Sequence, residues 1–395
     1  PNQHGFRKNH SCVTQLFEVI TDLHVNTHDN HQTDIIFIDF AKAFDTVPHS
    51  RLLLKLSRLR IEPCILNWIA SFLSNRTQSV KINASLSYQC SVSSGVPQGS
   101  VLGPLLFLIY VNDLPSSLTS TIRLFADDCV IYRKISDTSD HLILQNDLDR
   151  IGTWCTDWLM NINVSKSKHM NISTSPSRSP TEYSLQGRNI DRVSVYKYLG
   201  VHFSETLNWS HQVDCIVASA HKTLGFLKRN IFLAPPSTKL LAYNSLILPK
   251  LEYASAVWSP HQAYLVDRLE SVQNKAARFI SSDYSSFTSV TSLKNNLGLH
   301  SLEKRRRLSR LCLFHTIFNS ASTFRQTYCK PPSYISPRTD HQLKIQPPKS
   351  RTLLFSSSPV VMCIGDWNNM PYEVVSETNL AAYKLKCEQY LGMSS

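Results

Sequence analysis

The feature that most constrains this chain is a pair of adjacent acids, Asp127 and Asp128, between two apolar runs in the stretch RLFADDCVIY. The flanking residues are typical of buried strands, so the stretch predicts a β-hairpin with the acids at its turn. An ionised carboxylate close to a protein interior needs a counter-charge or a metal ion. Because Asp also favours turns, a polar hairpin turn without a metal is the alternative at this point.

A third acid ends another apolar run. In TDIIFIDFAKAFD, Asp39 follows a β-rich segment much as Asp127 does. If the two strands lie side by side, Asp39 comes next to Asp127 and Asp128, and three clustered carboxylates cannot all ionise without cations. Mg²⁺ prefers oxygen ligands and keeps positions open for substrate phosphates. Two such ions about 4 Å apart are the arrangement used for in-line phosphoryl or nucleotidyl transfer.

The segment SSGVPQGSVLGPLLF concentrates glycine. Three of the 11 glycines in the chain, Gly95, Gly99 and Gly103, recur here at a spacing of four. Such a cluster indicates close approach of another backbone or of a ligand. The side-chain amide of Gln98 is able to hydrogen-bond a sugar or a base edge. A tight turn followed by helix packing is the alternative.

Charge is unevenly spread along the 395 residues, which carry 41 Lys+Arg, 29 Asp+Glu and a formal net charge of +12. Residues 1–203 have 19 basic and 17 acidic side chains, whereas residues 204–395 have 22 and 12. This asymmetry fits an acidic polymer held mainly by the second half, with ordinary solubility charge as the alternative. The ten cysteines form no CxxC pair, which disfavours a zinc knuckle or a disulfide framework.

Five segments, in this order, resemble the reverse transcriptases of non-LTR (LINE-type) retrotransposons of the jockey/CR1 sort: FIDFAKAFD, GVPQGSVLGPLLF, FADD, WLMNINVSKSKHM and YKYLGV. The opening QHGFRKNHSCVTQL resembles the fingers motif of that branch, and LPKLEYASAVWSP and LESVQNKAARFI resemble its thumb. The resemblance implies an RNA-directed DNA polymerase, a nucleotidyltransferase that adds dNTPs to the 3′ end of a DNA primer. It also implies a fragment that lacks the N-terminal endonuclease of the element protein.

The fold implied by this resemblance is the α+β right-hand polymerase, with an antiparallel palm sheet, partial fingers and a helical thumb. We expect fingers and palm over residues 1–205, the thumb over 206–328 and a C-terminal segment over 329–395. The implied partners are an RNA template, a DNA primer and the element's own RNA in a ribonucleoprotein. The resemblance implies an intracellular protein that acts in the nucleus for integration and in the cytoplasm for particle assembly. No membrane partner is expected, since the longest apolar stretch, VLGPLLFLIYV, is too short to span a bilayer.

In this family an acidic triad binds two Mg²⁺ ions, with Mn²⁺ as an alternative. The resemblance assigns Asp39 and Asp127 as bridging ligands and Asp128 as support for the ion near the primer end. The backbone carbonyl of Phe40 is the expected further ligand. The role of these residues follows from the resemblance and is an expectation.

Four positions match the nucleotide pocket of the family. Phe44 occupies the place of the sugar-selecting residue, where a bulky ring excludes a ribose 2′-hydroxyl, and Ala43 beside it leaves room for the sugar. A core aromatic is the alternative for Phe44. Gln98 and Gly99 match the PQG element of the pocket. Arg7 is expected to reach the triphosphate, because a guanidinium suits phosphate oxygens, with a surface arginine as the alternative.

Two further elements complete the expected site. Lys166 is preferred over Lys168 as the acid that protonates the pyrophosphate, although the sequence does not separate the two. Tyr198, Leu199 and Gly200 match the turn that supports the primer end, and a strand with a bend is the alternative.

The basic run KRRRLSR, residues 304–310, is a candidate for contacts with template sugar and phosphate, and a solvated helix face is its alternative. Two other functions stay open. One is a decayed copy that binds nucleic acid without catalysis. The other is a two-metal nuclease, which the PQG element and Phe44 disfavour because hydrolysis needs no selection of a sugar.

Overall fold

The computed structural model describes residues 2–173, 181–336, 338 and 340–393. It divides into two compact units, the first formed by residues 1–15 and 30–196 and the second by residues 16–29 and 197–395. This division does not test the boundaries expected after residues 205 and 328, which stay predictions. Within the described part of the chain, no helix has both the length and the apolar character needed to cross a membrane.

The two units mix helices with strands, as the α+β class predicts. The strands are β1 (Gln32–Ile38), β2 (Arg76–Gln78), β3 (Lys81–Ile82), β4 (Ser85–Leu86), β5 (Cys90–Val92), β6 (Thr121–Phe125), β7 (Asp128–Ile135), β8 (Lys168–Ile172), β9 (Ser184–Leu185), β10 (Arg188–Asn189), β11 (Asp191–Arg192), β12 (Val195–Tyr198) and β13 (Val201–Ser204). The helices that follow one another up to residue 157 are α1 (Cys12–His28), α2 (Ala43–Thr46), α3 (His49–Arg58), α4 (Pro63–Leu73), α5 (Leu102–Val111), the short 3₁₀ helix η1 (Leu114–Ser117) and α6 (Thr138–Asp157).

The remaining helices belong to the second unit. They are α7 (Ser210–Asn230), α8 (Pro236–Leu246), α9 (Leu248–Glu252), α10 (Ser255–Trp258), α11 (Ala263–Ser281), α12 (Val290–Asn296), α13 (Leu302–Phe318), α14 (Thr323–Tyr328), α15 (Leu353–Ser356), α16 (Pro359–Asn368), α17 (Tyr372–Val375) and α18 (Leu380–Tyr390).

A five-stranded sheet in the order β11-β8-β1-β7-β6 forms the centre of the first unit. Strand β1 lies between β7 and β8 and is antiparallel to both, and all seven of its residues are buried. Its apolar run therefore reflects a central strand. Strands β6 and β7 form the hairpin predicted from RLFADDCVIY, because Phe125 pairs with Asp128 across a two-residue turn.

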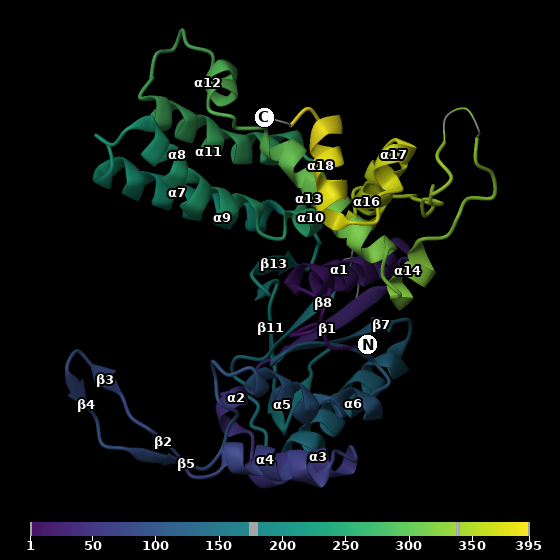
Figure 1. Ribbon diagram of the computed structural model, residues 1–395. Helices are drawn as coiled ribbons and strands as arrows, with labels where there is room; N and C mark the ends of the chain where they lie inside the picture. Colours follow the sequence, from purple (N-terminus) through teal and green to yellow (C-terminus); the bar gives the residue numbers. More distant parts are fainter. Residues whose placement is uncertain (1, 174–180, 337, 339, 394–395) are drawn as a thin grey trace. The chain divides into compact units, whose positions relative to one another are not determined.

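Helices cover one face of this sheet. Apolar residues of α3, α4, α5 and α6 form one buried cluster with β1, β6 and β7, and Figure 1 shows α5 and α6 on the same side of the sheet. Helix α6 begins with a capping box. The Asp137 carboxylate accepts the backbone N–H of Asp140, and the Asp140 carboxylate accepts the backbone N–H of Asp137. This packing fixes the strands and thereby the strand ends that carry the acids.

The N-terminal segment adds to the free edge of the hairpin. Gln3 forms a parallel bridge with Leu124 of β6. The His4 N–H donates to the Leu124 carbonyl (2.9 Å), and the Leu124 N–H donates to the Asn2 carbonyl (2.8 Å). The opening of the chain is therefore tied to the strand that leads into the acidic turn.

The basic run at residues 304–310 lies in α13, and most of its arginines are buried or ion-paired inside the second unit. Arg306 is 1% exposed and Arg310 6% exposed. Arg307 and Arg310 are both ion-paired with Asp366, at 2.9 and 2.7 Å. Neither expectation, a template contact or a solvated face, holds for Arg306, Arg307 and Arg310, because Arg306 is buried and the other two are ion-paired with Asp366 of the same unit.

Candidate active site

The structure brings three carboxylates to one end of the central sheet. Ile38, the last residue of β1, pairs with Cys129, so the next residue, Asp39, lies beside Asp128 at the start of β7. Asp127 occupies the turn immediately before Asp128. We refer to Asp39, Asp127 and Asp128 as the acidic triad. Its members come from two strands that are neighbours in the sheet.

The acidic triad holds like charges against one another. The pKa of Asp128 is raised to about 6, mainly because its carboxyl is partly removed from water and further because Asp127 and Asp39 are close. The pKa of Asp127 is also raised, mainly because its carboxyl is partly removed from water. A hydrogen bond from its own backbone opposes this rise, and the charge of Asp39 adds to it. Ionising the whole triad is therefore unfavourable without a cation.

Asp34, on the strand that precedes Asp39, has surroundings that differ from those of the acidic triad. Asp34 is fully buried on β1 and is satisfied by protein donors: Gln32 Nε2 (2.6 Å), Asn171 Nδ2 (2.8 Å) and Tyr183 Oη (2.6 Å). In the described part of the chain, no hydrogen bond or ion pair joins a carboxylate of the acidic triad to another side chain. An all-oxygen set with uncompensated negative charge fits a divalent cation such as Mg²⁺.

The turn that carries Asp127 and leads into Asp128 is strained and is held by the N-terminal segment. Ala126 has φ 55°, a value that non-glycine residues rarely adopt. The Gln3 side-chain oxygen accepts hydrogen bonds from the N–H groups of Ala126 (3.0 Å) and Gly5 (2.7 Å). A Cβ on Gly5 would lie 2.5 Å from the Ala126 nitrogen. The opening motif QHGFR is therefore a support of the acidic turn, a role that sequence reasoning missed.

A loop between α6 and β8 fixes the peptide of Asp39 on both sides. The Asp39 N–H donates to Ser167 Oγ (3.2 Å), and the Asn163 N–H donates to the Asp39 carbonyl (2.7 Å). Phe40 forms an antiparallel bridge with Ile162. Because the Asn163 bond uses the carbonyl of Asp39, it leaves the carbonyl of Phe40 available as the expected further ligand.

The same loop carries the two lysines that the sequence did not separate. Lys168 Nζ is 2.6 Å from Asp191 Oδ2 and donates to the Ser165 carbonyl, also at 2.6 Å. Lys166 is exposed, and among the described residues no hydrogen bond or ion pair engages its side chain. Lys166 is therefore the lysine free to reach a ligand.

The PQG loop packs against the segment that follows β1. The Val96 N–H donates to the Phe44 carbonyl (2.8 Å), and Gln98 Nε2 donates to Asp45 Oδ1 (2.8 Å). The half-buried ring of Phe44 stacks on Phe107 of α5 with the ring centroids 4.2 Å apart. The expected sugar-selecting residue is thus partly a core aromatic, and its role stays a prediction.

The glycine cluster serves two purposes. A Cβ on Gly95 would lie 2.7 Å from the Asp45 carbonyl oxygen, and one on Gly103 would lie 2.4 Å from the Pro97 carbonyl oxygen. These two positions confirm the predicted close approach of another backbone. Gly99 has φ +81° and nothing within 4 Å of a Cβ placed there, so it faces open space. Of the three, Gly99 is the position with room for a ligand.

Arg7 and Ala43 occupy different settings. Arg7 is exposed, its Nη1 donates to the Gln3 carbonyl (2.9 Å), and it lines a cavity together with Lys55 and Arg58. The lining of that cavity does not include the acidic triad. Ala43 is buried in α2. The expected contact of Arg7 with a triphosphate stays a prediction.

The segment expected to support the primer end is a tight hairpin turn in the second unit. Leu199 (φ 44°) and Gly200 (φ 82°) both have positive φ, as a type I′ turn requires. Tyr253 Oη donates to the Leu199 carbonyl (2.9 Å), and a Cβ on Gly200 would lie 2.8 Å from a ring carbon of Tyr253. Tyr198 is buried beside Phe203. The segment is therefore a turn packed beneath a tyrosine ring.

Tyr196 is a neighbour of the acidic triad that sequence reasoning missed. Its ring stacks on Phe37 of β1 with the centroids 4.1 Å apart. Its pKa is raised by burial and further by the charges of Asp39 and Asp128. The signal was present in YKYLGV, where Tyr196 stands two residues before Tyr198 on the same strand face.

Comparisons with known proteins identify the family of this chain. Residues 1–203 match the family model described as "Reverse transcriptase (RNA-dependent DNA polymerase)". The "Probable RNA-directed DNA polymerase from transposon X-element" of Drosophila melanogaster is 32% identical over 71% of this chain and 32% of its own length. The "RNA-directed DNA polymerase from mobile element jockey" of the same species is 30% identical over 71% and 32%.

A solved structure of apo telomerase from Candida tropicalis aligns with 99% of this chain and 54% of its own, at 8% identity and a TM-score of 0.43. The chain spans about a third of the length of the two transposon relatives. The family match over residues 1–203 contains β1, β6 and β7 and thus the whole acidic triad. This chain belongs to the reverse transcriptase family, with relatives among the polymerases of non-LTR retrotransposons.

Proposed function

We propose that this chain is the polymerase part of a non-LTR retrotransposon protein, an RNA-directed DNA polymerase that adds dNTPs to the 3′ end of a DNA primer. The observation that carries the proposal is the acidic triad, whose charge no other side chain of the described residues neutralises. In the right-hand arrangement, the five-stranded sheet is the palm. The N-terminal segment and the β2–β5 arm belong to the fingers, and the helices of the second unit supply the thumb.

The acidic triad is the proposed holder of two Mg²⁺ ions, or of Mn²⁺ in their place. Asp39 and Asp127 would hold both ions, and Asp128 and the Phe40 carbonyl would complete the protein ligands. Ions bound there would supply Lewis-acid chemistry, which would lower the pKa of the primer 3′-hydroxyl and stabilise the charge of the triphosphate and the leaving pyrophosphate. The protein's part is to hold the oxygens in place before substrate arrives. Gln3 does so for the turn, and the residue 163–167 loop does so for Asp39.

The pocket for the incoming dNTP is proposed to lie between the segment after β1 and the PQG loop. Because Phe107 supports one face of the Phe44 ring, the ring is fixed and its edge excludes a ribose 2′-hydroxyl. Asp45 orients the amide of Gln98 toward a sugar or base edge. Gly99 leaves the space in which the nucleotide is accommodated.

Two cations complete the proposed chemistry. Lys166, whose ammonium group is not consumed by an ion pair among the described residues, protonates the leaving pyrophosphate. Lys168 is unsuited to this role because Asp191 and the Ser165 carbonyl hold it. Arg7 is proposed to contact the triphosphate.

The proposed partners are an RNA template, a DNA primer and the element's own RNA. Contacts with them are mainly to sugar and phosphate, so they tolerate sequence changes and weaken with salt. Residues 204–395, with 22 basic against 12 acidic side chains, supply most of the attraction. The Leu199–Gly200 turn supports the primer end. The proposed places of action are the nucleus for integration and the cytoplasm for particle assembly.

Primer extension tests the proposal. The purified chain, with an RNA template annealed to a DNA primer, dNTPs and Mg²⁺, is expected to extend the primer. Asp127→Asn should lower the rate by at least ~10³-fold, since it would remove a charged ligand of the ions and with it several kcal/mol of stabilisation of the reacting phosphate. Asp157→Asn, which changes an exposed acid at the end of α6, is the matched control and should leave the rate unchanged.

Two outcomes would contradict the proposal. If the Asp127→Asn variant extends primers as fast as the unaltered chain, Asp127 does not hold the metal ions of the reaction. If the unaltered chain binds the primer–template but incorporates no nucleotide, the chain is the decayed nucleic-acid-binding copy instead.

A further inference from the structure

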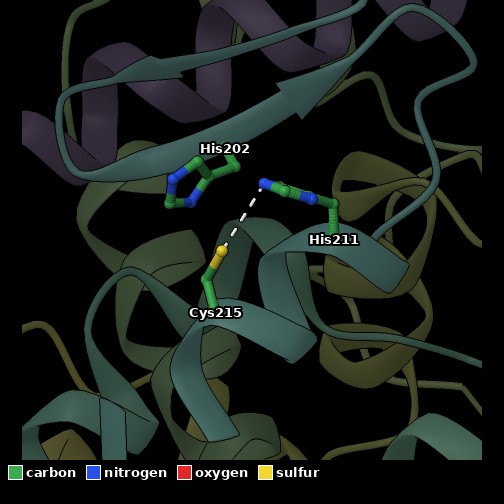
Figure 2. A group of neighbouring side chains, drawn as sticks. All are labelled: His202, His211 and Cys215. Atoms are coloured by element: carbon green, nitrogen blue, oxygen red, sulfur yellow. Dashed lines mark hydrogen bonds between the residues drawn. The ribbon is translucent and has the colours of Figure 1, made fainter. Parts of the chain in front are cut away.

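Three side chains of metal-binding type converge in the second unit, among residues that the proposed polymerase chemistry does not use. His202 lies on β13, and His211 and Cys215 lie one turn apart on α7. One nitrogen of each imidazole and the Cys215 sulfur all lie within 4.8 Å of one another. Figure 2 shows His211 and Cys215 facing each other, joined by their hydrogen bond, with the His202 ring beside them. We propose that His202, His211 and Cys215 form a Zn²⁺ site.

The distances within the cluster suit zinc. Residues four apart on a helix lie on one face, so His211 and Cys215 present their side chains together. His211 Nε2 and Cys215 Sγ are 3.5 Å apart. Tetrahedral zinc, with Zn–S near 2.3 Å and Zn–N of 2.0–2.1 Å, places a sulfur and a nitrogen ligand about 3.6 Å from each other. Two of the three ligands already stand at the separation that a shared ion requires.

A buried amide fixes the third ligand. Gln212 is 2% exposed, and its side-chain oxygen accepts the backbone N–H of His202 at 3.0 Å. The same oxygen is 2.9 Å from His202 Nδ1, which therefore carries the ring proton and donates to it. The neutral imidazole that results has an unprotonated Nε2. Hydrogen bonds of this kind orient histidines that bind metals and set their tautomer.

The chemistry of the ligands selects the ion. A thiolate with two imidazoles favours zinc over Mg²⁺ or Ca²⁺, which prefer oxygen. Three protein ligands leave the fourth tetrahedral position to water. Because His211 is exposed, the site is open to an ion from solution. The proposed zinc is thus chemically distinct from the Mg²⁺ expected at the acidic triad.

The position of the cluster indicates what a bound ion does. His202 follows the Leu199–Gly200 turn by two residues, and His211 and Cys215 belong to the first two turns of α7. An ion held by all three links β13 to α7 and restrains the hairpin that carries this turn. The role is structural, and it holds whether or not the chain polymerises DNA.

Zinc binding by the full-length chain tests this proposal directly. In a thiol-free reducing buffer, titration against a chromophoric chelator should give one tightly bound Zn²⁺ per chain. Cys215→Ala should weaken the affinity by more than ~100-fold, beyond the upper end of the loss caused by removing an outer hydrogen-bond partner of a ligand. Co²⁺ in place of Zn²⁺ should give the charge-transfer absorption of a cobalt–thiolate bond, and this band should be missing in Cys215→Ala.

Matched controls exclude general effects of losing a thiol or an imidazole. Cys64→Ser and His261→Ala change exposed residues outside the cluster and should leave zinc affinity and the cobalt band unchanged. Circular dichroism checks that each variant is folded. If the unaltered chain binds zinc no more tightly than Cys215→Ala does, or if Cys64→Ser loses the cobalt band, the proposal is overturned. The cluster is then only a hydrogen-bonded cysteine–histidine pair beside a second histidine.

Discussion

Gly5→Ala should impair polymerisation although Gly5 is not proposed to touch any substrate. Gly5 lies against the turn of the β6–β7 hairpin, where the Gln3 side chain bonds the N–H groups of both Gly5 and Ala126. The added Cβ would lie 2.5 Å from the Ala126 nitrogen, 3.0 Å from the Gln3 side-chain oxygen and 3.2 Å from the Phe125 carbonyl carbon. The contact with Ala126 is with backbone, which has no flexible side chain to swing away.

The size of the effect follows from the displacement. Ordinary van der Waals contact begins near 3.4 Å, so the two segments must separate by about 0.9 Å. Since Asp127 follows Ala126 directly, the carboxylate moves with the turn. A misplacement of about 1 Å at a reacting centre costs on the order of 10²-fold in rate. Overpacking of this kind also costs about 1–3 kcal/mol of folding free energy.

The assay is single-turnover primer extension at saturating dNTP, with chemical denaturation of the same preparations. Gly152→Ala is the matched control, because Gly152 lies inside α6 of the same unit and an added Cβ would meet only the Gln186 side chain at 3.5 Å. This variant should keep its rate. If Gly5→Ala extends primers at the rate of the unaltered chain, the N-terminal segment does not position the acidic turn.

Three further predictions rest on the same site. Phe44→Ala should admit ribonucleotides, measured as the ratio of rNTP to dNTP incorporation, and an unchanged ratio would reject the sugar-selecting role. Lys166→Ala should slow the chemical step by about 10²-fold or more, whereas Lys168→Ala should act mainly on stability, and equal rate losses would reject the assignment. For Asp128, the folded-state pKa of about 6 lies above its ordinary 3.8. The folded state therefore binds more protons between these values, and stability falls as pH rises through this window. In EDTA, the melting temperature of Asp128→Asn relative to the unaltered chain should accordingly increase from pH 4 to pH 7, and a difference that is flat or decreases with pH would contradict this.

Local pattern was enough to predict the hairpin and its acids. The apolar runs on either side of Asp127 and Asp128 form β6 and β7, and the run before Asp39 forms a fully buried central strand. Both follow from period and composition, which act over a few residues. The meeting of the two strand ends depended on the further prediction that the strands are neighbours. The antiparallel register of β1 with β7 confirms it.

The supports of the site were not predictable in the same way. The bond from the Ala126 N–H to Gln3 joins residues 123 apart, and the bond from the Asp39 N–H to Ser167 joins residues 128 apart. Neither pair has a local signature, because each depends on how the chain folds back on itself. The same limit explains the error over residues 304–310. The sequence does not reveal that Asp366, more than 50 residues away, pairs with Arg307 and Arg310.

The proposed zinc site at His202, His211 and Cys215 was not predicted from the sequence for a related reason. A search for paired cysteines finds nothing, since the ligands are one cysteine and two histidines. The signal was the His-x₃-Cys spacing of His211 and Cys215 on a helix, and the third ligand, His202, comes from the preceding strand. A helical pair of ligand residues with a histidine shortly before it would have been the pattern to seek.

Anomalous diffraction from crystals grown with Mn²⁺, an RNA–DNA primer–template and a dNTP would show directly whether Asp39 and Asp127 hold the metal ions. We expect manganese peaks within about 2.2 Å of carboxylate oxygens of both Asp39 and Asp127, the distance of a hard divalent cation from its oxygen ligands. Manganese bound to the nucleotide but to neither of these two aspartates would contradict it.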